Sequence, residues 1–158
     1  MGLRYAAFID QVAVTAVQDV FEITAPSSKA VCIHSIVIGQ GGGNDAGDAQ
    51  AEMLPLRLIR GNTTTGSGGA TVTPTPLETG FPAAGSTVKR NNTTVASAGS
   101  PVTVHADAFN VQAGWPYQPT PEEKIWLSPS QRLVVNLPVA PADSLTVSAT
   151  LIFEEFGG

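Results

Sequence analysis

The sequence predicts an all-β protein, a Greek-key or jelly-roll β-sandwich of about eight strands. One observation behind this prediction is the strict alternation of apolar and polar residues near the C-terminal end. A second is that short turns alternate with long excursions, which argues against a simple up-and-down meander. The third is composition: among 158 residues there are 16 Gly and 12 Pro, and only 13% of residues are charged. The length favours a single domain over residues 1–158.

The clearest alternation lies in residues 133–137 and 145–153. Leu133, Val135 and Leu137 share one face of the first segment, and Leu151 and Phe153 belong to the apolar face of the second. Period two with many β-branched residues indicates half-buried strands. The connector contains two prolines, which cannot continue a β-ladder. We expect the two strands to pair as an antiparallel hairpin that the rest of the chain covers.

Strands are also predicted at residues 18–24, 30–38, 52–60 and 101–110, with a short one at 125–127. Residues 1–17 are expected to form an extended N-terminal arm or strand. Pro55 places the strand 52–60 at a sheet edge or after a bulge. Residues 61–100 show almost no core-forming pattern and are predicted to be a long inserted Gly/Thr/Pro loop, either disordered or ordered by a partner on assembly, with a short strand near residues 70–73. Residues 112–123 resemble an extended arm of polyproline type.

Charge and cysteine content exclude several classes of function. The net charge is −5, and the eight Lys and Arg residues are scattered, so we expect no nucleic-acid partner. No apolar run is long enough to span a bilayer, and no signal peptide is recognised, so we expect synthesis in the host cytoplasm without export and no membrane partner. Cys32 is the one cysteine. It cannot form an intrachain disulfide and is expected to be a small buried hydrophobe.

No group of residues completes a catalytic, cofactor or metal site. The Gly-rich stretches lack the lysine and spacing of a phosphate loop, which favours flexible turns. Asn44, Asp45 and Asp48 offer oxygen ligands but not the spacing of a calcium loop, so a solvated loop is preferred. His105 and Asp107 share a strand face, where outward polar side chains are the simpler interpretation. His34 is expected to be a hydrogen-bonded core residue. We therefore expect no enzyme activity and no bound cofactor or metal.

Aromatic residues are the best candidates for an interaction site. Trp115, Tyr117 and Trp126 are suited either to stacking on a sugar or to holding the proline-rich arm across a neighbour, and the sequence leaves both open. The interface candidates are Trp115, Tyr117, Trp126, Phe81 and Arg90.

In outline the chain resembles the head decoration, or cement, proteins of tailed bacteriophages. The features that carry the resemblance are the strands 133–137 and 145–153 and the extended segments 61–100 and 112–123, in a small acidic chain without a catalytic constellation. The resemblance implies a virion protein that binds the outer surface of the capsid. Its partners would be the major capsid protein and further copies of itself, with a trimer favoured and a dimer possible.

Two other classes of function remain open at this point. A carbohydrate-binding or receptor-binding β-module would need an exposed coplanar pair of aromatic rings. A jelly-roll enzyme of cupin type would need a cluster of His and Glu ligands. The chain offers only His34 and His105 and has no His-x-His motif, which disfavours the enzyme.

Overall fold

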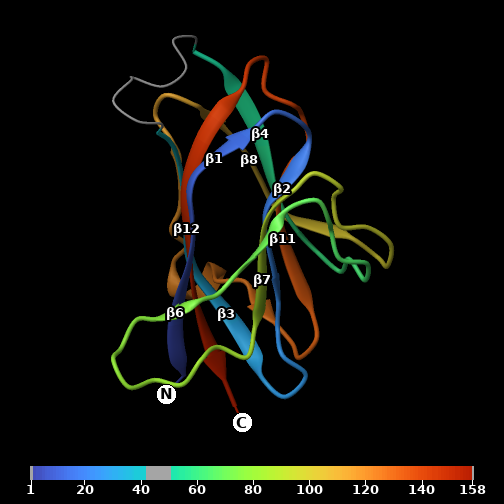
Figure 1. Cartoon of the computed structure of the whole chain (residues 1–158). Coiled ribbons are helices and arrows are strands. Elements are labelled where there is room, and N and C mark those ends of the chain that lie inside the picture. Colours follow the sequence, from blue (N-terminus) through green and yellow to red (C-terminus); the bar gives the residue numbers. More distant parts are fainter. Residues whose placement is uncertain (1, 42–50, 158) are drawn as a thin grey trace.

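The computed structural model describes residues 2–41 and 51–157, and these form two antiparallel sheets packed face to face (Figure 1). The one helix in this part of the chain is a short 3-10 turn, η1 (Pro121–Glu123). The strands are β1 (Leu3–Val14), β2 (Gln18–Thr24), β3 (Ala30–Gln40), β4 (Met53–Arg60), β5 (Ala70–Val72), β6 (Thr75–Pro76), β7 (Thr87–Asn92), β8 (Val102–Asn110), β9 (Trp115–Tyr117), β10 (Trp126–Leu127), β11 (Arg132–Leu137) and β12 (Leu145–Phe156).

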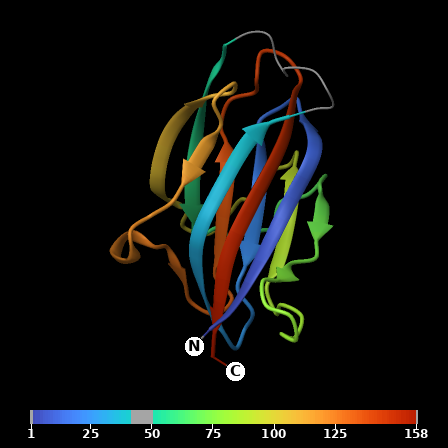
Figure 2. The same ribbon diagram turned by 90° about the vertical axis from the view of Figure 1, so that its left-hand side faces the viewer.

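The strand order is that of a jelly roll. Sheet A has the order β10-β3-β12-β1-β6, with β9 also paired to β3, and sheet B has the order β5-β7-β2-β11-β4-β8. Eight strands make the jelly roll, because β1-β12-β3-β9 of sheet A faces β2-β11-β4-β8 of sheet B. The sequence-based prediction of fold class is confirmed. Figure 2 shows β3, β12 and β1 side by side along the front sheet.

The predicted C-terminal hairpin is wrong. β11 pairs with β2 and β4 in sheet B, whereas β12 pairs with β1 and β3 in sheet A. Both strands do have one apolar face, as expected, but they bury it by facing each other across the core rather than by pairing. The connector between them contains Pro138 and Pro141, and it carries the chain from one sheet to the other.

The core lies between the two sheets and is built by alternation along the strands. In β12 every second residue from Leu145 to Glu155 is buried, and the residues between them are partly exposed. At the centre of sheet A the rings of Tyr5 and Phe153 stack at 5.6 Å between centroids. Cys32 is buried, as predicted.

The structure decides two local predictions. Residues 3–14 form the predicted strand rather than an extended arm, and they pair with β12 in sheet A from Leu3↔Glu155 to Val14↔Leu145. β4 is not an edge strand, since it lies between β11 and β8. However, β11 pairs only with Arg57–Arg60, so Pro55 lies beyond that pairing and its missing N–H breaks no hydrogen bond on that side.

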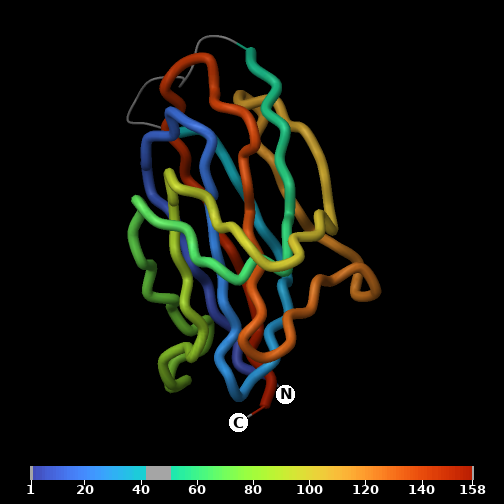
Figure 3. The backbone as a smooth tube through the Cα atoms, turned by 90° about the vertical axis from the view of Figure 1, so that its right-hand side faces the viewer, coloured from blue at the N-terminus to red at the C-terminus, as the bar shows by residue number. Residues whose placement is uncertain are grey.

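Residues 61–100 are not a structureless insertion. They contain β5, β6 and β7, and Val88 of β7 reaches the core. The segments on either side of β5 and β7 meet in two isolated bridges, Thr64↔Ser97 and Ser67↔Thr94. We call residues 61–69 and 93–100 the flap, because together they cover part of the outer face of sheet B (Figure 3).

Candidate interaction surface

Trp115 and Tyr117 lie inside the molecule, with 4% and 8% of their surface exposed. Their rings stack at 6.0 Å and 19°, and β9 places them where the edge of sheet A approaches β8. The Trp115 Nε1–H donates to Asp107 Oδ2 at 2.9 Å, and the Tyr117 hydroxyl donates to the Glu123 carbonyl at 3.3 Å. Both rings are therefore used to join β9 to its neighbours and offer no free face to a sugar.

His105 and Asp107 do share a face of β8, as predicted, but that face looks toward β9 rather than simply outward. His105 Nε2 lies 3.9 Å from Asp107 Oδ2, and its ring packs edge-on against Tyr117 at 5.1 Å. The hydrogen bond from Trp115, followed by that from the Ala108 amide, holds the pKa of Asp107 below its usual value. Through these contacts with Tyr117 and Trp115, the two residues join β8 to β9.

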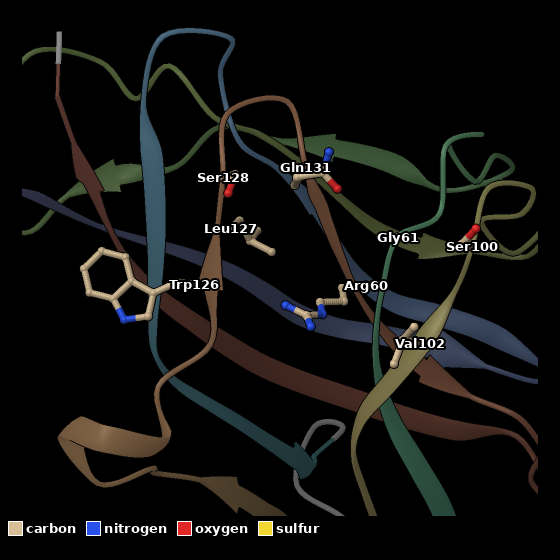
Figure 4. A pocket seen from close by; sticks show the side chains of 8 residues that line it. All are labelled: Arg60, Gly61, Ser100, Val102, Trp126, Leu127, Ser128 and Gln131. Atoms are coloured by element: carbon tan, nitrogen blue, oxygen red, sulfur yellow. The ribbon is translucent and has the colours of Figure 1, made fainter.

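Trp126 is the predicted aromatic residue that stays exposed, at 51%. Strand alternation in β10 sends Leu127 into the core and the Trp126 ring to the outside (Figure 4). There the ring lies 5.0 Å from the ring of Phe156 at a tilt of 41°. The pocket beside them has a volume of about 330 Å³ and is also lined by Arg60 and Val102. A tilted pair does not give the coplanar platform that a sugar-binding module would present.

The other two interface candidates lie apart from Trp126. Phe81 is partly exposed in the segment between β6 and β7. Arg90 lies in β7 and lines a shallow depression together with Phe8. Trp115, Tyr117, Trp126, Phe81 and Arg90 are thus not gathered into one surface.

The outer face of sheet A is a broad uncharged surface that the sequence analysis did not single out. Cross-strand pairing places Phe8, Thr150, Val37 and Pro116 in one row. The neighbouring row holds Ala6, Ile152 and Ser35. We call these seven residues the sheet A face. One sequence pattern does point to a second apolar face in residues 5–9, because Ala6 and Phe8 alternate with the inward Tyr5, Ala7 and Ile9.

Exposure and charge set this face apart. Phe8 is 52% exposed and Val37 is 43% exposed, and both are large apolar residues on the outer face of long strands. Between them lies a depression of about 430 Å³. Among the described residues, charged groups lie at its ends. Asp10 and Arg90 lie beyond Phe8. At the opposite end Arg4 pairs with Glu154, His34 Nε2 lies 2.7 Å from Glu154 Oε2, and Lys124 Nζ lies 3.1 Å from His34 Nδ1. His34 is hydrogen-bonded, as expected, but it is partly exposed rather than in the core.

Over β2 and β11 the outer face of sheet B, in contrast, is covered by the flap, which two buried carboxylates hold in place. Glu22 accepts hydrogen bonds from the Thr65 hydroxyl at 2.6 Å and the Gly66 amide at 2.8 Å. It also accepts from Asn92 at 3.1 Å, and Arg132 Nε lies 2.9 Å from its carboxylate.

Asp19 is the second buried carboxylate. It accepts from the Ala96 amide at 2.6 Å and from Asn136 at 2.8 Å. Burial raises the pKa of Asp19 to about 6, because desolvation outweighs these two donors and the nearby Glu22 carboxylate adds to the effect. The flap therefore covers the β2 and β11 part of sheet B, whereas the outer face of sheet A has no such cover.

No protein-family model matches this chain, and no curated protein or solved structure shows significant similarity to it. Among the described residues no three or more His, Cys, Asp or Glu side chains are grouped as a metal site would require. Asn44, Asp45 and Asp48, the possible calcium ligands, lie outside the described residues. Within residues 2–41 and 51–157 there is no helix long and apolar enough to cross a membrane.

Proposed function

We propose that this protein is a structural component of a phage virion, which binds the outer surface of the capsid and stabilises it. The observation that carries the proposal is the sheet A face: an uncharged surface with exposed Phe8 and Val37 that no other segment of the described chain covers. Exposed apolar patches of this kind mark protein–protein contact sites. The partners would be the major capsid protein and further copies of the chain.

The net charge of −5 supports a position outside the shell. An acidic protein gains nothing from contact with a packaged nucleic acid, whose phosphates attract Lys and Arg. Many copies arranged on a symmetric shell need only modest affinity each, because their contacts with one another add to retention. A trimer would suit a three-fold position on the capsid, and a dimer would suit a two-fold position.

The test is binding of the purified protein to expanded, undecorated capsids formed by the major capsid protein encoded near its gene. We expect it to bind and to raise the temperature at which the capsids break open. Phe8→Glu should abolish binding, because it replaces the largest exposed apolar side chain of the uncharged face with a charge. Val139→Glu is the matched control: Val139 is 51% exposed, but it lies in the connector between β11 and β12. Both substitutions should change stability by no more than about 0.5 kcal/mol.

The alternative is a carbohydrate- or receptor-binding module, and the same experiment separates the two. If the wild-type protein neither binds capsids nor protects them from heat, and instead binds a glycan through the Trp126 pocket, the virion proposal is wrong. Retention of capsid binding by Phe8→Glu, with loss in Val139→Glu, would show that the sheet A face is not the contact.

A further inference from the structure

We propose that β8 is a dimerisation edge, at which two copies of this chain join sheet B to sheet B in antiparallel fashion about a two-fold axis. This inference does not depend on the proposed function, because it concerns a sheet edge and not the sheet A face. It begins with a comparison of the sheet edges in the described part of the chain.

The other outer strands are short, and two contain proline. β5 has three residues, β6 has two, β9 has three and β10 has two. Pro76 lies in β6 and Pro116 in β9. Short strands and proline are devices that prevent a sheet edge from pairing with another chain. Where β1 extends beyond β6 it bends at Gln11, whose φ is 50°, and the Asn91 side chain donates to the Ala13 carbonyl.

β8 lacks those devices. It has nine residues, contains no Pro, Lys or Arg, and pairs on one side only, with β4. Six of its residues are exposed, and Phe109 alone in the strand is buried. A strand so poorly covered contributes little to the monomer's core. Its free edge nevertheless presents backbone N–H and C=O groups in a regular row.

The backbone groups that face outward can be assigned from Pro55. Pro55 lies opposite Ala108, and because proline has no N–H, this position is a non-hydrogen-bonded pair of the β4–β8 ladder. The Ala108 amide is consistent with this assignment, since it donates to the Asp107 side chain at 2.8 Å instead of to β4. Residues alternate along a ladder, so Ala106, opposite Arg57, also directs its N–H and C=O toward the free edge.

A two-fold axis at Ala106 would place the whole length of β8 in the interface. In that register Ala106 of one copy exchanges both backbone hydrogen bonds with Ala106 of the other, and Val102 lies opposite Asn110. The bulge opposite Leu58 and Ile59 displaces the pairing near Val102, and the Ala108 amide already donates to Asp107, so we expect the tightest pairing at Ala106 itself.

The same register is complementary in charge. It places His105 of each copy opposite Asp107 of the other, in the closely spaced, non-hydrogen-bonded positions where side chains interact most strongly. Each Asp107 oxygen already accepts one hydrogen bond, from Trp115 or from Ala108, and a carboxylate oxygen can accept a second. The contact is isologous and closed, so it yields a dimer and leaves neither copy's β8 edge open.

The experiment is sedimentation velocity on the purified protein across a range of concentrations. The wild-type chain should sediment as a dimer, at twice the 16.3 kDa of one chain. Ala106→Glu should raise the dimer Kd at least about tenfold, because two carboxylates would meet on the axis. Ala70→Glu is a matched control: Ala70 is also an exposed alanine in an edge strand opposite an arginine, Arg90, as Ala106 is opposite Arg57. It should leave the dimer intact.

A second measurement covers the case in which a variant folds poorly. Amide hydrogen exchange of the wild-type protein should slow at Ala106 as concentration rises, because its outward N–H becomes paired. A wild-type chain that stays monomeric to about millimolar concentration would overturn the proposal. So would an oligomer of any size whose mass is unchanged by Ala106→Glu and whose Ala106 amide exchanges equally fast at every concentration.

Discussion

Asp19 and Glu155 are both buried carboxylates, but their surroundings shift their pKa values in opposite directions. Burial alone would raise the pKa of Glu155, but hydrogen bonds from the Ser86 hydroxyl at 2.8 Å and amide at 2.7 Å, together with Lys29 at 3.1 Å, hold that pKa below its usual value. Asp19 has fewer donors, so desolvation dominates and its pKa is raised to about 6. The ionised form of Glu155 therefore favours the folded state, whereas for Asp19 it is the protonated form that does so.

The first prediction concerns Asp19 and pH. Between the unfolded pKa of about 3.9 and the folded pKa, the native state binds more protons than the unfolded state. The Asp19 contribution to the free energy of unfolding is therefore fully present below about pH 4 and is lost as pH rises through about 6, an effect of about 3 kcal/mol. In urea unfolding, Asp19→Asn should become more stable relative to wild type between about pH 4 and pH 7. A difference that does not change with pH would contradict this prediction.

At the scale of single elements, the sequence predicted strand content better than strand partners. The alternation in residues 145–153 identified the buried face of β12, because period two follows directly from strand geometry. It could not reveal that β11 lies in the opposite sheet, since an amphipathic strand buries its apolar face equally well by pairing or by facing. The flap was missed because it is held by buried carboxylates and tight backbone contacts rather than by apolar residues. A side chain at Gly69, for example, would meet the Arg90 carbonyl at 2.0 Å.

The candidate interaction surface was likewise predicted only in part. Sequence reasoning selected aromatic residues, and of these Trp126 is exposed while Trp115 and Tyr117 are buried. Aromatic character does not specify which side of a sheet a ring takes until the strand partners are known. Phe8 and Val37 belong to one surface only because β1 and β3 both pair with β12, and no local pattern in the sequence carries that information.

The second prediction compares the two faces of β12. Leu151 has no exposed surface and points into the core, so Leu151→Ala should lower the free energy of unfolding by about 2–5 kcal/mol. Ser148 lies on the outer face and accepts a hydrogen bond from the Gln11 amide at 3.1 Å, in an exposed position. Ser148→Ala should cost less than about 1 kcal/mol. Chemical denaturation of both variants makes the comparison, and equal losses would mean that both faces of β12 are buried.

The third prediction concerns the flap as an element. Because Glu22 accepts from Thr65, Gly66 and Asn92, brief digestion with a non-specific protease should spare residues 61–69 in the wild-type protein. Glu22→Gln replaces one acceptor oxygen with a donor group, which leaves buried donors unpaired at a cost of about 1–3 kcal/mol and should expose the flap to cleavage. Glu78→Gln, at an exposed position, is the control. Rapid cleavage within 61–69 of the wild-type chain would show that the carboxylate does not hold the flap.

At the scale of the whole molecule, the jelly roll pairs the beginning of the chain with its end. β1 pairs with β12, and β2 pairs with β11, so neither sheet can form until distant segments have met. A true C-terminal hairpin would have provided a local starting point for folding. Because the connector instead crosses between sheets, the cost of closing long loops comes before most of the stabilising contacts.

The last prediction follows from this topology. We expect refolding from denaturant to take milliseconds to seconds, the range of β-sandwiches dominated by pairing between distant segments. The chain has two Trp residues, so Trp126→Phe leaves Trp115 as the fluorescent probe, and burial of Trp115 requires β9 to reach both β3 and Asp107 of β8. Its signal should therefore appear together with the far-ultraviolet circular dichroism of the sheets, in a single phase. If Trp115 becomes buried in microseconds, well before the sheets form, the contact of β9 with β3 and β8 does not depend on pairing between distant segments, and the prediction is wrong.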